Sequence, residues 1–199
     1  VNFTILLVWH PTDDRELFTL EDLIKEFQLE RIGKSGAILD QKKLDWLNRE
    51  YIKKLSAEEI EKSILAWLPE KMRNPKLTSI IFDRISKWGD IEKIVEAGEL
   101  DFFFKQPEYE KSKLIYKNSN SEKTSENLRM VIKSLENLDS SNFTVENIKN
   151  AIMAIANKLE SRGELLHPVR YALSGLDKSP DPFVIADILG KNETLSRLQ

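Results

Sequence analysis

The apolar side chains of this sequence recur at the helical period of 3.6 residues and almost never at the strand period of two. Only seven glycines and seven prolines occur among 199 residues, so long helices meet few breakers. The pattern predicts a mainly α protein, a helical bundle or cage. The clearest apolar stripes are Ile60, Ile64, Leu65 and Leu68, then Leu128, Val131, Ile132, Leu135 and Leu138, then Ile148, Ala151, Ile152, Ile155 and Leu159.

Local capping signals predict where several helices begin and end. Thr19, with Asp22 three residues on, is expected to cap a short helix. Ser56 with Glu59 has the spacing of a capping box, in which each side chain satisfies a free backbone donor of the other residue. The polar run 118–121 is the best candidate for a boundary between two helical subdomains. Further starts are expected at Asp40, Asp90 and Thr144, and ends at Pro69 and Gly163.

Composition excludes several classes of protein. The chain has no cysteine and no apolar run of about 18 residues, which argues against a disulfide scaffold and a membrane span. With only two distant histidines, a zinc site or a Cys/His nucleophile is not expected. Val1 opens an apolar segment without a basic flank, so we expect a soluble intracellular piece of a longer protein rather than a signal peptide.

Two features that resemble binding motifs are better explained otherwise. Gly33-Lys34-Ser35 copies the end of a phosphate-binding loop, but that loop needs a glycine where Gln28 stands and a strand before it. A solvated loop is the better interpretation. Trp46, Trp67 and Trp88 occupy apolar stripes and are assigned to packing.

A cationic stretch stands out inside this slightly acidic chain, whose net charge is −3. Between residues 71 and 87, five cations accompany the single acid Asp83, a balance that suits a phosphate backbone. An ordinary charged helix face is an equally good interpretation. The cations are Lys71, Arg73, Lys76, Arg84 and Lys87.

A second constellation lies near the C-terminus, where His167-Pro168-Val169-Arg170 precedes Ser179-Pro180-Asp181-Pro182-Phe183. An arginine, a hydroxyl, a stiff turn and an aromatic ring are the parts needed to hold splayed single-stranded bases. The alternative is structural, with Pro168 at a helix start, Arg170 paired with Asp177 and Phe183 in the core.

Both ends of the chain resemble the glutamyl-tRNA synthetase family. The segments that carry the resemblance are collinear, with a diverged middle between about 69 and 142. They are Phe18-Thr19-Leu20-Glu21-Asp22-Leu23-Ile24, Ala37-Ile38-Leu39-Asp40, Lys43-Leu44-Asp45-Trp46-Leu47-Asn48 with Tyr51-Ile52, Leu166-His167-Pro168-Val169-Arg170-Tyr171-Ala172-Leu173-Ser174-Gly175, Ser179-Pro180, and Ile188-Leu189-Gly190-Lys191.

The resemblance implies a parent enzyme that couples glutamate to tRNA using ATP and Mg²⁺ on a preceding catalytic domain. Neither a His-Ile-Gly-His nor a Lys-Met-Ser-Lys type signature occurs here, so we expect this fragment to be inactive and to hold no cofactor or metal. It implies the end of a stem-contact region over 1–55 and anticodon-binding subdomains over 56–106 and 107–199. A cytoplasmic monomer that binds glutamate tRNA is expected; glutamine tRNA as a second partner and an organellar location stay open.

The same resemblance implies anticodon contacts at Arg170, Ser179, Pro180 and Phe183, with His167 beside them. Asp181 and Pro182 depart from the pattern of many relatives. A donor-only cation would favour cytosine over guanine at the third anticodon base, and the candidates are Arg84 and Lys87. The competing hypothesis is a helical protein-interaction module without sequence-specific RNA binding.

Overall fold

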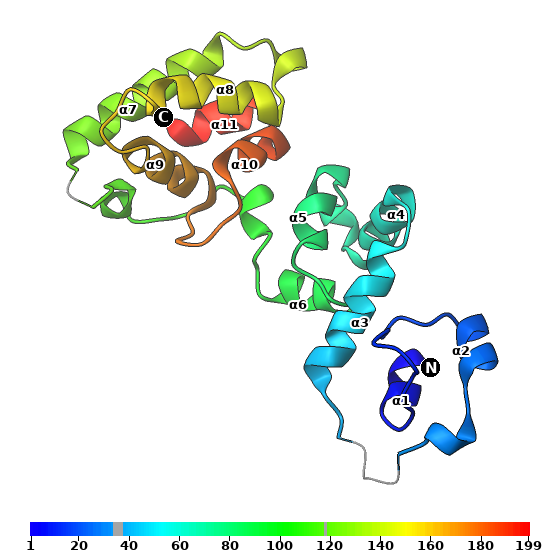
Figure 1. Cartoon of the computed structure of the whole chain (residues 1–199). Coiled ribbons are helices and arrows are strands. Elements are labelled where there is room, and N and C mark those ends of the chain that lie inside the picture. The colour runs from blue at the N-terminus through cyan, green and yellow to red at the C-terminus, as the bar shows by residue number, and fades with distance from the viewer. Residues whose placement is uncertain (34–37, 118) are drawn as a thin grey trace. The chain divides into compact units, whose positions relative to one another are not determined.

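The computed structural model describes residues 1–33, 38–117 and 119–199 (Figure 1). Those residues form eleven α-helices, six short 3-10 helices and one isolated antiparallel bridge between Trp9 and Ile32, with no β-strand among them. The mainly α prediction is therefore confirmed. The α-helices are α1 Asn2–Leu6, α2 Leu20–Glu26, α3 Gln41–Lys53, α4 Ala57–Trp67, α5 Thr78–Phe82, α6 Asp90–Glu96, α7 Ser121–Glu136, α8 Val145–Ala156, α9 Gly163–Ser174, α10 Pro182–Leu189 and α11 Lys191–Leu198.

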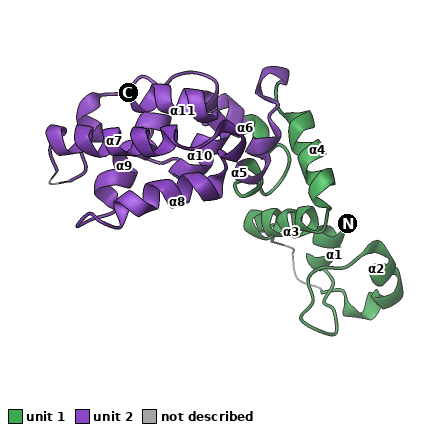
Figure 2. Ribbon diagram, turned by 90° about the horizontal axis from the view of Figure 1, so that it is seen from above, with its two compact units in different colours: residues 1–69, 81–92 green, residues 70–80, 93–199 purple. Residues whose placement is uncertain are grey.

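The chain divides into two compact units (Figure 2). Unit 1 contains residues 1–69 and 81–92, and unit 2 contains residues 70–80 and 93–199. These units are defined by packing, so the functional segments 1–55, 56–106 and 107–199 stay predictions. The 3-10 helices are η1 Leu29–Arg31 in unit 1, and η2 Glu70–Met72, η3 Pro75–Leu77, η4 Asp101–Phe103, η5 Lys111–Leu114 and η6 Ser140–Asn142 in unit 2.

Most of the capping predictions are confirmed. The predicted Ser56–Glu59 capping box begins α4, and the predicted cap Thr19 begins α2, where it forms a second capping box with Asp22. Asp40 and Thr144 cap α3 and α8. Such caps form because the donor and acceptor lie within one turn of chain, so the bond depends little on the rest of the fold.

One predicted helix boundary is confirmed and another is wrong. Asp90 is the first residue of α6, as expected, and its carboxylate also accepts from the backbone N–H groups of Ser86 and Lys87 in the preceding turn. Helix α8 ends at Ala156, and Gly163 begins α9 rather than ending α8. At Gly163 the absent Cβ matters because a Cβ there would lie 2.4 Å from Tyr116 Cζ.

Unit 1 contains a small apolar cluster and a polar connection through Tyr51. Trp9, Phe18 and Leu23 bury their side chains together, with the Trp9 and Phe18 rings edge to face. The Tyr51 hydroxyl on α3 donates to the Phe18 carbonyl at 2.8 Å and accepts from Asn2 Nδ2 at 2.9 Å. These bonds tie α3 to the N-terminal segment.

Unit 2 contains a larger core that helices α7 to α11 share. Burial of each large aliphatic side chain contributes about 1.5–3 kcal/mol, so this core is the main source of stability in the unit. The fully enclosed members include Val131, Leu135, Ile148, Ile152, Leu165, Val169, Leu173 and Ile185.

Candidate nucleic-acid interface

Helix α9 carries the His167 to Arg170 segment, and it contains a proline in its interior. Pro168 lacks the N–H that would bond to the Glu164 carbonyl one turn earlier. The buried side chain of Asn127 on α7 donates to that carbonyl instead, at 3.2 Å. The interpretation of Pro168 as a helix start is therefore wrong, because a side chain from another helix replaces the missing donor.

The other end of α9 is closed by Gly175, whose backbone is left-handed at φ 67°. Its N–H donates to the Tyr171 carbonyl at 2.7 Å, and Ser174 Oγ donates to the Arg170 carbonyl at 2.8 Å. A side chain is excluded at this glycine, since a Cβ would lie 2.7 Å from Pro107 Cβ. This turn fixes the direction in which the chain leaves α9, the helix that carries Arg170.

Arg170 itself is partly exposed, and its guanidinium has no hydrogen bond or ion pair among residues 1–33, 38–117 and 119–199. The suggested pair with Asp177 does not form there. An arginine keeps five donors in a planar fork, so an unpaired one can bind a base edge or a phosphate.

The predicted site residues of the loop before α10 and of the start of that helix differ in exposure. Ser179 and Pro180 are partly exposed, and Asp181 caps α10 by accepting from the Phe183 N–H at 2.8 Å. Phe183 is only 5% exposed and belongs to the unit 2 core. The prediction that its ring offers a stacking platform is wrong for this conformation, because Pro182 begins a helix that turns the ring inward.

His167 is engaged within the protein. Its Nε2 lies 2.8 Å from the carbonyl oxygen of Lys113, and its ring contacts the rings of Tyr116 and Tyr171, at centroid distances of 5.7 and 6.0 Å. This nitrogen is therefore not free for RNA. The structure gives His167 a contact with a segment 54 residues away instead.

The cationic stretch 71–87 divides between the two units. Lys71, Arg73 and Lys76 belong to unit 2, whereas Arg84 and Lys87 belong to unit 1. Lys71, Arg73 and Arg84 are exposed.

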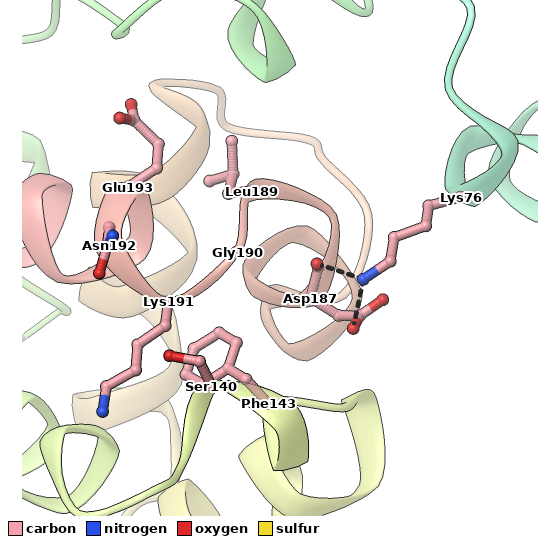
Figure 3. Close-up of a pocket in the computed structure, with 9 residues that line it drawn as sticks. All are labelled: Lys76, Ser140, Phe143, Asp187, Leu189, Gly190, Lys191, Asn192 and Glu193. Carbon is pink, nitrogen blue, oxygen red and sulfur yellow. Dashed lines mark hydrogen bonds and ion pairs between the residues drawn. The ribbon is translucent and has the colours of Figure 1, made fainter.

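Lys76 lines a hollow of about 500 Å³ in unit 2, together with Asp187 and Lys191 (Figure 3). Its Nζ lies 2.8 Å from Asp187 Oδ1 and 2.9 Å from the Asp187 carbonyl oxygen. Lys191 Nζ donates to the carbonyls of Glu136 and Leu138 at the end of α7. Both ammonium groups thus have partners, so an RNA phosphate would have to compete with Asp187 for Lys76, whose role as a phosphate contact stays a prediction.

Lys87 is occupied as well. Its Nζ lies 2.9 Å from Asp45 on α3 and 3.3 Å from Asp90. The Asp45 hydrogen bond, with that of Asp90, raises the pKa of Lys87, and the Lys87 hydrogen bond lowers the pKa of Asp45. A base would have to displace two carboxylates to reach this ammonium group.

The tryptophans are not all in the core. Trp46 and Trp67 are 42% and 41% exposed, so their assignment to packing is wrong, while Trp88 is partly buried. The apolar stripes that contain Trp46 on α3 and Trp67 on α4 are wider than the faces that these helices bury. Trp9, by contrast, is only 1% exposed.

No described helix is long and apolar enough to cross a bilayer. Within the same ranges, no three histidine or acidic side chains gather in a way that could hold a metal ion. The phosphate-loop candidate at Gly33-Lys34-Ser35 falls largely outside the described residues.

Comparison with known proteins decides the family. A family model for the anticodon binding domain matches residues 39–199. The chain belongs to the anticodon binding domain family. The whole chain is also 35% identical over 207 aligned positions to a glutamate–tRNA ligase of Clostridium botulinum, and 37% identical over 206 aligned positions to that of Clostridium novyi.

Those alignments span the whole chain but only 41% and 42% of the two ligases, so the chain has about two-fifths of their length. The crystal structure of a glutamate tRNA ligase from Elizabethkingia meningosepticum superimposes with a TM-score of 0.79 at 28% identity, covering 99% of this chain and 39% of that one. For the enzyme of Elizabethkingia anophelis the TM-score is 0.72 at 27% identity, with 99% and 38% covered.

Sequence reasoning missed several residues that shape this anticodon binding domain. Tyr109 packs edge to face on Tyr171 at 5.3 Å, and Tyr116 packs on His167. Arg197 is buried and donates to three backbone carbonyls. Aromatic residues spaced along an otherwise polar segment were the signal for the tyrosines; nothing local distinguishes Arg197 from an exposed helix arginine.

Proposed function

We propose that this chain is the anticodon-reading portion of a glutamate–tRNA ligase, and that Arg170 contacts an anticodon base. The observation that carries the proposal is an unpaired, partly exposed arginine on α9, within the region that matches the anticodon binding domain. Ser179 and Pro180, on the loop before α10, are the neighbouring candidates.

The catalytic role is proposed for the parent protein alone. ATP and Mg²⁺ would be bound by a portion that this chain does not include, and we assign no step of the coupling reaction to its residues. The parent is proposed to act as a monomer in the cytoplasm.

The experiment is binding of the 199-residue chain to four RNAs at low, fixed salt. Three are stem-loops that carry the glutamate anticodon, the glutamine anticodon or a scrambled loop, and the fourth is the glutamate stem without its loop. Preference for the glutamate loop over the scrambled loop supports the proposal. Equal binding to the glutamate and glutamine loops would indicate a parent that accepts both tRNAs.

Arg170→Ala should weaken binding to the glutamate loop by about 1–3 kcal/mol, the usual value of one specific base contact. Arg129→Ala is the matched control, because Arg129 is an exposed arginine on α7 without an ion pair in the described ranges. If the two variants bind equally well, Arg170 is not the base contact.

A second candidate is a protein-interaction module, favoured by the apolar side chains that unit 1 exposes. Leu20 and Ile24 on α2 are 61% and 73% exposed. Such a surface suits a partner helix. The same RNA experiment separates the two functions, because an interaction module would show no preference among the three loops.

A further inference from the structure

A segment of unit 2 lies along α9 and brings cations to the helix that carries Arg170. We call residues 107–117 the strap. It includes η5 and follows α9 as the green segment beside that helix in Figure 1.

The first end of the strap packs closely on the C-terminal half of α9. Tyr109 lies edge to face on Tyr171, and Pro107 occupies the space where a Cβ of Gly175 would lie. Burial raises the pKa of the Tyr109 hydroxyl. This end is anchored by apolar contact and by the absence of a side chain on the glycine.

The second end is anchored on the N-terminal half of α9. His167 Nε2 lies 2.8 Å from the Lys113 carbonyl oxygen, and the Tyr116 ring fills the space beside Gly163. Contacts at both ends hold the backbone between them in one position on the helix.

The strap carries three exposed lysines after its last acidic residue, Glu110. Lys111, Lys113 and Lys117 have no carboxylate partner among residues 1–33, 38–117 and 119–199, and Lys117 lies 5.1 Å from the Tyr116 ring centroid. From 111 to 117 the local charge is +3, in a chain of net charge −3. Exposed ammonium groups without a carboxylate partner can neutralise RNA phosphates.

The strap also lies close to the proposed base contact. The Lys113 carbonyl bonds to His167, which precedes Arg170 by three residues, or about 4.5 Å along a helix axis. A side chain of lysine length covers that distance. An RNA loop that reaches Arg170 would therefore bring its backbone near these lysines.

We infer that the strap is a phosphate-contact element for the same RNA, with Lys111, Lys113 and Lys117 as its cations and His167 as the residue that positions it. The inference rests on the proposed function. Arg170 distinguishes bases, whereas the strap supplies affinity that does not depend on sequence.

The test compares two charge-matched triple variants of the 199-residue chain. One replaces Lys111, Lys113 and Lys117 with alanine. The other replaces three exposed lysines elsewhere in unit 2, which are Lys133 on α7, Lys149 on α8 and Lys158 after α8. Affinity for the glutamate stem-loop is measured across a range of salt concentrations, and far-UV circular dichroism confirms that both variants are folded.

Each lost phosphate contact should lower the slope of log affinity against log salt by about 0.7–0.9. In the strap variant the slope should therefore fall by about 2 to 3, and the affinities for the three stem-loops should decrease by the same factor, so that the ratios between them are unchanged. The control variant should keep the wild-type slope. Equal slopes for the two variants would overturn the inference.

The role of His167 has a test of its own. In the otherwise wild-type chain, His167→Ala should lower the slope of log affinity against log salt. In the strap variant, the same substitution should have no further effect on binding. His167→Gln, which retains an N–H donor for the Lys113 carbonyl, should restore most of the slope. An equal loss in both backgrounds would show that His167 contacts RNA directly.

The two proposals can fail separately. If the wild-type chain prefers the glutamate loop while both triple variants behave alike, only the strap inference is wrong. If the wild-type chain shows no preference among loops but the strap variant loses salt dependence, the strap binds RNA and the anticodon assignment is wrong.

Discussion

Residues 1–33 and helices α7 to α11 have similar local signals but differ in how they pack. Both regions contain helices that begin at a side-chain cap, α2 in the first and α7 and α8 in the second. The buried apolar side chains of residues 1–33 are Trp9, Phe18 and Leu23, while Leu29 and other large apolar side chains are exposed. The C-terminal helices enclose a larger shared core. Local pattern sets where helices form, and the area that they bury decides how stable each region is.

The sequence offers a direct way to measure this difference. All four tryptophans, at positions 9, 46, 67 and 88, belong to unit 1. Tryptophan fluorescence therefore follows unfolding of unit 1, whereas far-UV circular dichroism follows helices of both units. We expect the fluorescence transition at lower urea, with a second transition in circular dichroism from the better packed unit 2.

The largest expected effect is that of Arg197→Ala in unit 2. Arg197 is 5% exposed and donates to the carbonyls of Phe102, Leu173 and Lys105. Removing the guanidinium leaves these acceptors without their donor, which should cost about 3–5 kcal/mol in the free energy of unfolding. The circular dichroism transition of unit 2 should move to lower urea.

The control is the exposed Arg129→Ala, which should change the free energy of unfolding by less than about 0.5 kcal/mol. If both variants unfold at the same urea concentration, the buried bonds of Arg197 add nothing to stability.

Gly175→Ala should destabilise unit 2 by about 2–4 kcal/mol. Left-handed backbone costs a residue with a Cβ about 1–2 kcal/mol, and the contact 2.7 Å from Pro107 adds an overpacking cost. Gly98→Ala isolates the backbone part, because Gly98 also has positive φ but its Cβ would meet only the Asp101 carboxylate, at 3.4 Å. Equal losses in urea unfolding would show that the strap yields at Pro107.

Asn127→Ala should destabilise unit 2 by about 1–3 kcal/mol, because it leaves the Glu164 carbonyl without a donor inside α9. Pro168→Ala supplies a backbone N–H that can bond to that carbonyl. The cost of Asn127→Ala should therefore be smaller in the Pro168→Ala background, as measured by a double-mutant cycle in urea. Additive effects would contradict the compensation.

The smallest effect concerns unit 1 and its pH dependence. The pKa of Asp45 is lowered by its Lys87 hydrogen bond; that of Asp90 is also lowered, because hydrogen bonds from Ser86 and Lys87 outweigh burial. A carboxylate with a lowered pKa stabilises the fold above its ordinary pKa, about 3.9, and that stability is lost as pH falls through the lowered value. Lys87, whose pKa is raised, stabilises the fold below about 10.4 and loses this effect as pH rises through the raised value.

The urea midpoint of the fluorescence transition should thus be level between about pH 5 and 9 and fall on both sides. Asp45→Asn should lower the urea midpoint between about pH 5 and 9, and the midpoint should then decrease less as the pH falls below 5. Asp14→Asn, at an exposed carboxylate without a hydrogen bond or ion pair in the described ranges, should leave the profile unchanged. If Asp45→Asn leaves the pH profile of the urea midpoint as unchanged as Asp14→Asn does, the Asp45–Lys87 ion pair has no effect on stability.

Local chemistry could be predicted well from the sequence. The helix cap at Thr19, the capping box at Ser56 and the mainly α class are confirmed, since each depends on residues within a few positions of one another. The family resemblance is confirmed by the match over residues 39–199. Arg170 stays a predicted site residue, now with a partly exposed and unpaired guanidinium.

Contacts between distant segments could not be predicted in this way. Phe183 is buried, Trp46 is exposed, and Lys87 is held by Asp45, which lies 42 residues earlier. Each outcome depends on which helix faces are covered by other elements, and a helical stripe does not encode that.

The sequence by itself determined that this chain is helical, where many of its helices begin, and to which family it belongs. Only the tertiary structure decided which cations are free and which rings are buried. The physical reason is that hydrogen-bonded caps form within one turn, whereas the pairing of a charge or the burial of a ring depends on segments brought together by packing of the whole unit.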